Sequence, residues 1–500
     1  MAFLPISGIA AAAEAVSDKQ AIQILDRLGF GPTAADVAHV KAVGIDRYIA
    51  EQLDPAAIAE NPELTVRLDA LDTLKLNPVQ LFVEYGPLRP ANGVKPTGDE
   101  QKAQRQRARV IVQQSAEARV LRALYSRRQL QEVMVDFWFN HFNVFAQKGL
   151  DHLWVGAFEE QAIRPNALGH FRDLLLATAK SPAMLFYLDN WENSASGSHM
   201  PNGREAGINE NYARELMELH TLGVDGGYSQ DDVVALAHIL TGWGLARPNQ
   251  KPPDGTAFLF DASRHDNESK HFLGHDIAPA GEAEGVEALD LLAKSPATAH
   301  HLAFQLAQYF VADQPPPALV EKLAARFLAT DGDIRATLQT LFVSPEFRSS
   351  LGDKYKTPYR YVLSAARAAG VAVKNPQPLL GAMARQGMPL YGCATPDGYK
   401  DVADKWLSPD ATMVRAAFAV ALANGNLPLG GDPPAEEVAM QPAAGNDAAD
   451  PPVKHTPVDA AALEMLIGPV LSANTRTVVA EAPEAQRAAL LLGSPEFMHR

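Results

Sequence analysis

The sequence predicts a mainly α fold, a multi-helix single-domain assembly with one small β-hairpin near residues 257–274. Three observations support this class. Apolar residues recur at the 3.6-residue spacing of amphipathic helices, strand-like alternation is scarce, and 47% of the 500 residues are hydrophobic, enough for a sizeable core. The helical spacing occurs in residues 18–28, 33–53, 101–145, 157–188, 209–222, 229–243 and 298–310.

The hairpin is predicted from two short runs rich in Phe and Leu, residues 257–260 and 270–273. A polar stretch containing Asp266-Asn267, a pair common in turns, separates them. We expect the two runs to pair with each other, or to form a long structured loop.

Composition divides the chain into three parts. Residues 1–426 carry most of the helical spacing and form the predicted main helical domain. Residues 427–456 are rich in Pro, Ala and Asp and poor in large apolar residues, as expected of a flexible linker. Residues 457–500 are again helical in pattern, and we expect them to pack on the main domain as a C-terminal helical segment.

Charge and cysteine content exclude several classes of protein. The 44 Lys and Arg residues and 59 Asp and Glu residues give a net charge of −15, which argues against nucleic acid as a partner. The single cysteine, Cys393, excludes an internal disulfide framework and a Cys-ligated iron–sulfur cluster. Apolar runs are too short for a membrane span. The basic stretch 102–109, with Arg119, Arg122, Arg127 and Arg128, is most simply a solvated helix face.

The first residues leave the location of the protein open. Residues 2–13 are apolar and end in small residues, like the hydrophobic part of a secretory signal, but no charged segment precedes them. Residues 1–15 are therefore either part of a longer signal peptide or an ordinary N-terminal arm. The first alternative predicts a periplasmic or secreted protein and the second a cytoplasmic one.

His141 is the first candidate for chemistry. At helical spacing it shares an aromatic stripe with Phe137 and Trp138, while Asn140 lies on the opposite side. It is either a buried neutral histidine satisfied by hydrogen bonds or a desolvated base or metal ligand with a lowered pKa.

The second candidate is the segment 209–223, NENYARELMELHTLG, an amphipathic helix that Gly223 can end. Arg214, Glu215 and Glu218 share its polar face. This face is either solvated, with an Arg214–Glu218 ion pair, or it lies in a cleft where the two glutamates act as acid and base. The spacing lacks the Glu-x-x-His pair of helical di-metal sites, so no metal ligands are predicted.

The third candidate is the segment 264–275, which holds three histidines in twelve residues and the pair His265-Asp266. The histidine spacing matches no recognised zinc pattern, so a polar loop and a substrate contact both stay open. Gly-rich phosphate loops, Gly-x-Ser-x-Gly and His-Glu-x-x-His are absent from the sequence.

Seven segments resemble a large bacterial family known as Domain of Unknown Function 1800. They are LDRLGFGPT at 25–33, FWFNHFNVF at 137–145, NENYARELMELHTLG at 209–223, YSQDDVVALAHILTGW at 228–243, HDNESKHFLG at 265–274, KTPYRYVLSAARAAG at 356–370 and PDGYKDVADKWLSP at 396–409. The resemblance spans nearly the whole chain. It implies no assigned activity, but members are commonly exported and often encoded beside a protein resembling alkaline phosphatases and sulfatases. The first residues of this chain contain no twin arginine, the motif of the twin-arginine export signal.

The resemblance implies a set of functional positions. The family's polar positions fall here on Asn140, His141, Asn209, Glu210, Asn211, Arg214, Glu215, Glu218, His265, Asp266 and Lys270. Phe139 stands where the family often has histidine, and His220 where it often has phenylalanine, so roles that depend on those two positions are in doubt.

Two functions follow from these patterns. The first is an extracytoplasmic hydrolase or lyase of an envelope or extracellular polymer, with Glu215, Glu218 and His141 as catalytic residues. The remaining family positions, Asn140, Asn209, Glu210, Asn211, Arg214, His265, Asp266 and Lys270, would then bind substrate. The second is a non-catalytic envelope scaffold that docks a neighbouring exported protein resembling phosphatases or sulfatases. No cofactor is predicted, and the sequence leaves a bound metal open.

Overall fold

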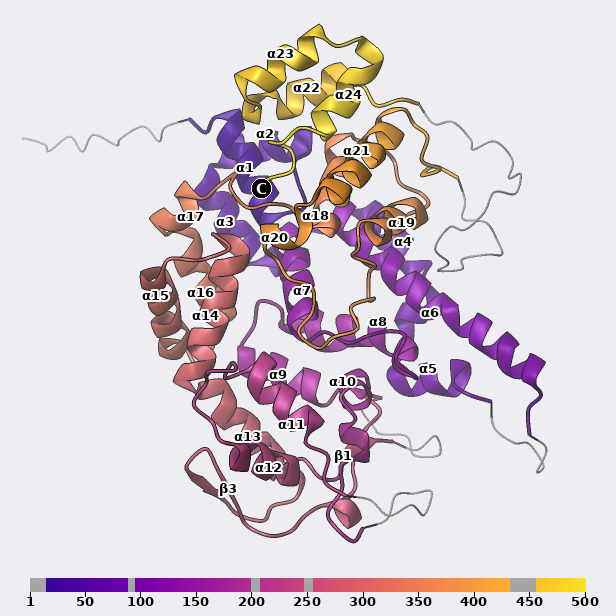
Figure 1. Cartoon of the computed structure of the whole chain (residues 1–500), viewed down its shortest axis with the longest axis vertical. Coiled ribbons are helices and arrows are strands. Elements are labelled where there is room, and N and C mark those ends of the chain that lie inside the picture. The colour runs from indigo at the N-terminus through magenta and orange to yellow at the C-terminus, as the bar shows by residue number, and fades with distance from the viewer. Residues whose placement is uncertain (1–14, 89–94, 199–206, 247–254, 432–455) are drawn as a thin grey trace, which may run out of the picture.

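The computed structural model describes residues 15–88, 95–198, 207–246, 255–431 and 456–500 (Figure 1). The N-terminal part contains α1 (Asp18–Leu28), α2 (Ala34–Val43), α3 (Ile45–Leu53), α4 (Pro62–Asp69), α5 (Pro78–Tyr85), the long α6 (Gly98–Tyr125) and α7 (Gln129–His141). The middle contains α8 (Val155–Ala157), the π-helical turn η4 (Phe158–Ile163), α9 (Phe171–Ala179), α10 (Pro182–Tyr187), α11 (Asn211–Glu215), the π-helical turn η7 (Leu216–His220) and α12 (Gln230–Ile239).

Four short strands and the remaining helices complete the described part of the chain. The strands are β1 (Trp243–Leu245), β2 (Phe258–Phe260), β3 (Lys270–Phe272) and β4 (His275–Ile277). The helices are α13 (Glu282–Lys294), α14 (Pro296–Phe310), α15 (Pro317–Ala329), α16 (Ile334–Phe342), α17 (Pro345–Ser349), α18 (Pro358–Ala368), α19 (Gln377–Arg385), α20 (Ala403–Trp406), α21 (Pro409–Ala423), α22 (Ala460–Ile467), α23 (Ala473–Glu481) and α24 (Glu484–Leu492). The mainly α fold class is therefore confirmed.

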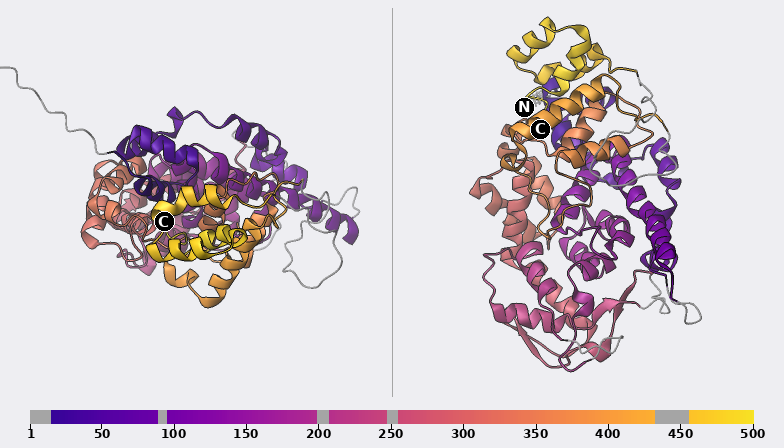
Figure 2. Two further views of the ribbon diagram at one scale, coloured as in Figure 1. Left: turned by 90° about the horizontal axis from the view of Figure 1, so that it is seen from above. Right: turned by 45° about the vertical axis from the view of Figure 1, so that its right-hand side comes forward.

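The elements are arranged along one long axis. Helices α22–α24 lie at one end, above α1, α2 and α21, while β1, β3, α12 and α13 lie at the other end (Figures 1 and 2). Helices α7 and α18 cross the middle, and their buried faces contribute to one apolar core that runs through the molecule. Helix α24 packs on α21, and α1 contacts the turn after α22.

The strand prediction was right in position and wrong in pairing. The runs at 257–260 and 270–273 contain β2 and β3, but β2 pairs with β1 and β3 pairs with β4, which makes two antiparallel sheets. The turn chemistry explains this. Leu273 and Gly274 have φ values of 49° and 79°, the left-handed pair that closes a two-residue hairpin, so β3 turns back at once onto β4.

Two predicted helical stretches are interrupted. The stretch 101–145 divides into α6 and α7 at Ser126, whose hydroxyl accepts from the Arg128 amide and donates to Glu60. The stretch 157–188 divides into η4, α9 and α10, with Pro165 following the π-helical turn. Proline lacks the amide hydrogen that a continued helix needs.

The predicted linker, residues 427–456, falls largely outside the described residues. Its first residues are packed, because Leu429 is buried and its carbonyl accepts from the amides of Lys374 and Asn375. The predicted C-terminal segment continues this packing. The Val458 amide donates to the Ala423 carbonyl, and the Lys356 amide donates to the Met498 carbonyl.

A chain of buried charges runs through the centre of the fold; we call it the central charge network. It begins at Arg119 in α6, whose guanidinium contacts Glu159 of η4 at 3.1 Å and Asp136 of α7 at 2.5 Å. The other carboxylate oxygen of Asp136 accepts from the Tyr309 hydroxyl of α14, which itself accepts from Arg360 of α18. Four helices and one π-helical turn are thereby tied together.

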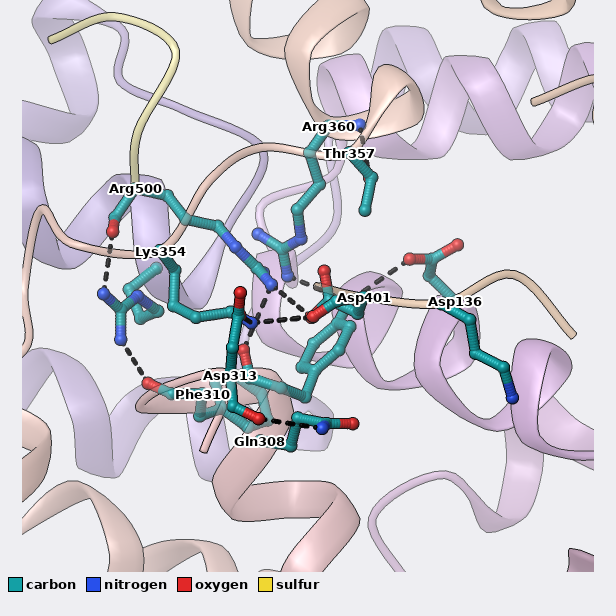
Figure 3. Close-up of polar contacts among 12 residues, drawn as sticks. Asp136, Gln308, Phe310, Asp313, Lys354, Thr357, Arg360, Asp401 and Arg500 are labelled. Carbon is teal, nitrogen blue, oxygen red and sulfur yellow. Dashed lines mark hydrogen bonds and ion pairs between the residues drawn. The ribbon is translucent and has the colours of Figure 1, made fainter. Parts of the chain in front are cut away.

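The network continues beyond α18. Arg500 donates to the Tyr309 carbonyl and forms an ion pair with Asp401 at 2.6 Å, and Lys354 pairs with Asp313 (Figure 3). At the other end, Arg164 binds Glu132 at 2.6 Å. The network therefore joins segments from the N-terminal, central and C-terminal parts of the sequence.

Burial corrects the expectation that the arginines of α6 form a solvated face. The side chains of Arg119 and Arg122 are 5% and 14% exposed and pair with carboxylates, so these two belong to the interior. Burial alone would lower the pKa of Arg119, but Glu159, Tyr359 and Asp136 raise it well above its usual value.

We predict that Arg119→Met lowers the free energy of unfolding by about 3–5 kcal/mol, because it leaves the carboxylates of Asp136 and Glu159 buried without their cation. Chemical denaturation at neutral pH measures the change. Arg105→Met is the control, since Arg105 is exposed on the same helix and its replacement should change stability by less than about 0.5 kcal/mol. Equal stabilities of the two variants would contradict this role of the network.

Candidate functional site

The predicted helix at 209–223 is built as α11 followed directly by η7. Asn209 opens it, because its side-chain oxygen accepts from the Asn211 amide, and Gly223 ends it with a φ of 84°. The side-chain amide groups of Asn209 and Asn211 donate to the carbonyls of Asp189 and Leu188. Both asparagines thus hold the start of α11 against the end of α10.

Glu215 and Glu218 lie on either side of the junction between α11 and η7. Here the backbone changes from α-helical to π-helical, a feature often found at functional sites. We call the surrounding group the polar face; its side chains come from α11, η7, the loop before α12, the start of α12 and the loop at 397. It comprises Glu210, Arg214, Glu215, Glu218, Tyr228, Gln230 and Asp397.

The two glutamates have different surroundings. Partial burial, together with the charges of Glu218 and Asp397, raises the pKa of Glu215, and Arg214 opposes this only in part. Glu218 lies 3.6 Å from the Arg214 guanidinium and is hydrogen-bonded to Tyr228. Burial and Glu218 raise the pKa of Tyr228 to about 12, so its hydroxyl keeps its proton at neutral pH.

Arg214 links the glutamates to the rim of the polar face. Its guanidinium donates to Glu210 and to Gln230, both at 3.0 Å, and the Gln230 amide group donates to Glu210 at 2.8 Å. About a third of each of the Arg214 and Glu210 side chains is exposed. The rim is therefore open to solvent and to ligands.

Asn140 and Asn143, at the end of α7, hold the loop that carries Asp397. The Asn140 side chain accepts from the Tyr399 amide at 2.7 Å and donates to the Tyr399 carbonyl at 2.8 Å. Gly398 has a φ of 65°, and a Cβ there would lie 2.3 Å from the Asn140 carbonyl oxygen. This close approach requires glycine and fixes the distance between α7 and the loop.

His141 is buried among aromatic rings, and both of its ring nitrogens have partners. Nδ1 lies 2.7 Å from the Gln305 side-chain amide group and Nε2 lies 3.1 Å from the His220 carbonyl. Burial and the nearby His301 lower its pKa to about 4, so the ring is neutral at neutral pH. His141 therefore holds the end of η7 against α14 in its uncharged form.

His265, Asp266 and Lys270 belong to a second, separate group. His265 Nε2 contacts Glu284 Oε1 at 2.9 Å, and Lys270 Nζ contacts Glu284 Oε2 at 2.7 Å. His238 pairs with Asp266 at 2.6 Å. Hydrogen bonds from Lys270 and His265 lower the pKa of Glu284 although burial opposes this. The group connects β3 and the preceding loop to α12 and α13.

The structure thus brings together some of the predicted site residues and separates others. Glu210, Arg214, Glu215 and Glu218 share the polar face, while Asn140, His141, Asn209 and Asn211 support its backbone. In the separate group, Lys270 pairs with Asp266 and Glu284, and His265 pairs with Glu284. Among the described residues, no three His, Cys, Asp or Glu side chains are placed to hold a metal ion.

Sequence reasoning missed Asp397 and Tyr228, which complete the polar face, because neither lies at helical spacing from the glutamates. It also missed Asp151, a fully buried carboxyl group whose two oxygens lack hydrogen-bond partners. Burial raises the pKa of Asp151 to about 9; nearby Lys148 opposes this rise and Asp189 adds to it. Lys148 instead binds Asp189, with both carboxylate oxygens at 2.9 Å.

Asp151 should make the protein less stable as pH rises. Between its ordinary pKa of about 4 and its folded value of about 9, the folded state binds a proton that the unfolded state has released. We predict that Asp151→Asn removes this pH dependence. The difference in unfolding free energy between the variant and the wild type should then shift in favour of the variant as pH rises through that window. Thermal unfolding across the window measures this, and parallel curves for the two proteins would contradict it.

At Glu284, unlike at Asp151, removing the carboxylate should destabilise the protein. Glu284→Gln should lower the free energy of unfolding by about 3–5 kcal/mol at neutral pH, because it leaves Lys270 buried without its carboxylate. Glu287→Gln, at an exposed position of the same helix, is the matched control. Chemical denaturation compares them, and a loss of less than about 1 kcal/mol for Glu284→Gln would rule out the structural role.

Comparison with known proteins agrees with the resemblance seen in the seven sequence segments. No curated protein and no solved structure matches the chain. No helix in the described part of the chain is both long and apolar enough to span a membrane. A family model matches residues 23–499, nearly the whole chain. The chain therefore belongs to the family described as Protein of unknown function (DUF1800).

Proposed function

We propose that the protein is a hydrolase or lyase that acts on an envelope or extracellular polymer through Glu215 and Glu218. One observation carries the proposal: two carboxyl groups one helical turn apart have different surroundings, and the pKa of one of them, Glu215, is raised. Burial and the neighbouring carboxylates of Glu218 and Asp397 raise the pKa of Glu215, whereas Glu218 lies beside the Arg214 guanidinium and is hydrogen-bonded to the Tyr228 hydroxyl. Such a pair is the usual basis of acid–base catalysis by carboxylates.

The two glutamates divide the proton transfers between them. In hydrolysis, the Glu215 carboxyl group donates its proton to the leaving oxygen, while the Glu218 carboxylate takes a proton from the attacking water. In elimination, Glu218 takes the proton from the substrate carbon instead. The Arg214 guanidinium and the Tyr228 hydroxyl contact the Glu218 carboxyl group and orient it before the reaction.

The other residues have positioning roles in this scheme. His141 holds η7 through the His220 carbonyl, and Asn140 holds the loop of Asp397 through Tyr399. Glu210 and Arg214 form the open rim where substrate binds. We leave His265, Asp266 and Lys270 out of the substrate site, since Glu284 and His238 occupy their polar atoms. The assignment of an envelope or extracellular polymer as the substrate depends on the frequent export of family members.

A second candidate function is a docking surface for a neighbouring exported protein resembling phosphatases or sulfatases. One observation favours it: Val224, which follows Gly223 at the end of this segment, is a large apolar side chain that is 69% exposed. In that function Glu210 and Arg214 would form interface ion pairs, and the protonation of Glu215 would have no effect on binding.

Activity of variants on purified polymers tests the first function. Glu215→Gln and Glu218→Gln should each lower turnover of peptidoglycan or exopolysaccharide by about 10²-fold or more, whereas Glu321→Gln, exposed on α15, should leave it unchanged. Wild-type activity should fall as pH rises through the raised pKa of Glu215, because the acid loses its proton. That limb of the pH profile should disappear in Glu215→Gln.

Stability measurements keep this test interpretable. An acid whose pKa is raised in the folded state disfavours folding once it ionises, so Glu215→Gln should be at least as stable as the wild type at neutral pH. A variant that folds normally and retains full turnover would refute the acid role. Unchanged turnover combined with loss of partner binding in Val224→Asp would favour the docking function.

A further inference from the structure

A cavity of about 590 Å³ lies outside the polar face, on the side of the molecule where α5, α10 and β1 meet (Figure 1). Its walls come from α5, from the turn before α8, from the end of α10 and from the sheet of β1 and β2. This volume lies within the range of small-molecule sites in proteins. None of the individual catalytic or substrate-binding residues predicted from the sequence lines it, although Arg264 begins the candidate segment 264–275.

Aromatic rings line one wall of this cavity, which we call the aromatic cavity. Phe82 stacks on Trp154 with ring centroids 6.0 Å apart, and Phe186 stacks on Trp191 at 5.6 Å. Trp154 and Phe186 meet edge to face at 6.0 Å, so the four rings form a continuous row. Each ring is held by another ring, which keeps the wall rigid before any ligand arrives.

Polar groups also line the aromatic cavity. Asp261 and Ser263 follow β2 and line the cavity together with Arg264. The carboxylate of Asp261 accepts from the Ser263 amide and hydroxyl and lies 3.8 Å from the Arg264 guanidinium. The side chain of Asp261 is 28% exposed, so it has room for further hydrogen bonds. The charges of Asp261 and Arg264 balance each other.

We propose that the aromatic cavity binds a neutral sugar unit of a glycan chain. A pyranose ring has an apolar C–H face and a rim of hydroxyl groups, and the cavity offers an aromatic wall for the first and a carboxylate acceptor for the second. The identification of this glycan as the polymer substrate rests on the proposed function. Binding itself does not depend on it.

The charged and polar groups of the cavity favour a neutral saccharide over an anionic glycan or an acyl chain. An anionic glycan would find no net positive charge in the pair of Asp261 and Arg264, and it would approach a protein with a net charge of −15. A fatty acyl chain would cover the part of the Asp261 carboxylate that is open to water without offering it a hydrogen bond, which costs binding free energy. A neutral saccharide satisfies both the rings and the carboxylate.

The position of the cavity also fits a polymer that reaches the polar face. Phe186 lines the cavity, and the carbonyl of Leu188, just after the end of α10, accepts a hydrogen bond from the side chain of Asn211 in α11, the helix that ends at Glu215. The Tyr187 hydroxyl donates to the Ala394 carbonyl, in the loop that continues to Asp397. One short helix therefore separates the aromatic cavity from the candidate acid.

Calorimetric titration with cellohexaose and chitohexaose tests the proposal, with hexagalacturonate and decanoate as the anionic and acyl comparisons. The protein is the full chain carrying Glu215→Gln, so that no turnover interferes. We expect at least one neutral hexasaccharide to bind. Phe82→Ala and Asp261→Asn should each weaken that binding by about tenfold or more. Tyr85→Ala, on the same helix as Phe82 but outside the cavity, should leave it unchanged.

The outcomes separate the two proposals. Tighter binding of decanoate or hexagalacturonate than of either neutral sugar would overturn the ligand assignment, and so would no sugar binding at all. Equal sugar affinity in the wild type, Phe82→Ala and Asp261→Asn would place the site elsewhere. Thermal unfolding shows whether Phe82→Ala is folded. Asp261→Asn keeps the size of the side chain and provides a second test of whether the cavity binds the sugar. Normal sugar binding with no catalytic loss in Glu215→Gln would refute the proposed acid alone.

Discussion

Most of the architecture depends on the mutual satisfaction of buried charges. Arg119 lies beneath aromatic rings with only Asp136 and Glu159 to compensate its charge, and a buried ion without its partner costs several kcal/mol. The guanidinium, the carboxylates and the Tyr309 hydroxyl accept only a narrow range of distances and angles. Apolar packing alone allows helices to slide, whereas this network fixes the positions of α6, α7, η4, α14 and α18 relative to one another.

The same constraint positions the polar face. Helix α7 is held near its middle by Asp136, and its C-terminal end carries Asn140 and His141, which bind the loop of Tyr399 and the end of η7. The neutral His141 suits this task, because its pKa of about 4 keeps charge out of an aromatic environment. The network therefore supports the two glutamates through the rigid body of α7.

Charged residues in this protein fall into two physical groups. His265, Lys270 and Glu284 satisfy each other fully, which is the behaviour of a structural ion pair. Burial raises the pKa values of Glu215 and Asp151, nearby cations offset this only in part, and neither carboxyl group forms an ion pair within the part of the chain that the structure describes. Uncompensated carboxyl groups disfavour folding, so their presence is better explained by chemistry than by stability. Glu215 is also reachable from solvent, while Asp151 is not, which makes Glu215 the candidate acid.

The sequence by itself determined the local features. Apolar spacing predicted the mainly α class, the strand runs and the amphipathic segment of Glu215 and Glu218, because these depend on neighbours within a few residues. Only the tertiary structure decided which of the polar residues meet. The sequence pattern predicted that Arg119 lies on a solvated helix face, because it could not show that Asp136 and Glu159 pack against that face. The pairing of β2 with β1, the approach of Asp397 to Glu215 and the row of rings in the aromatic cavity likewise join residues far apart in the chain. Such contacts arise from packing and charge compensation between helices, which no local pattern records.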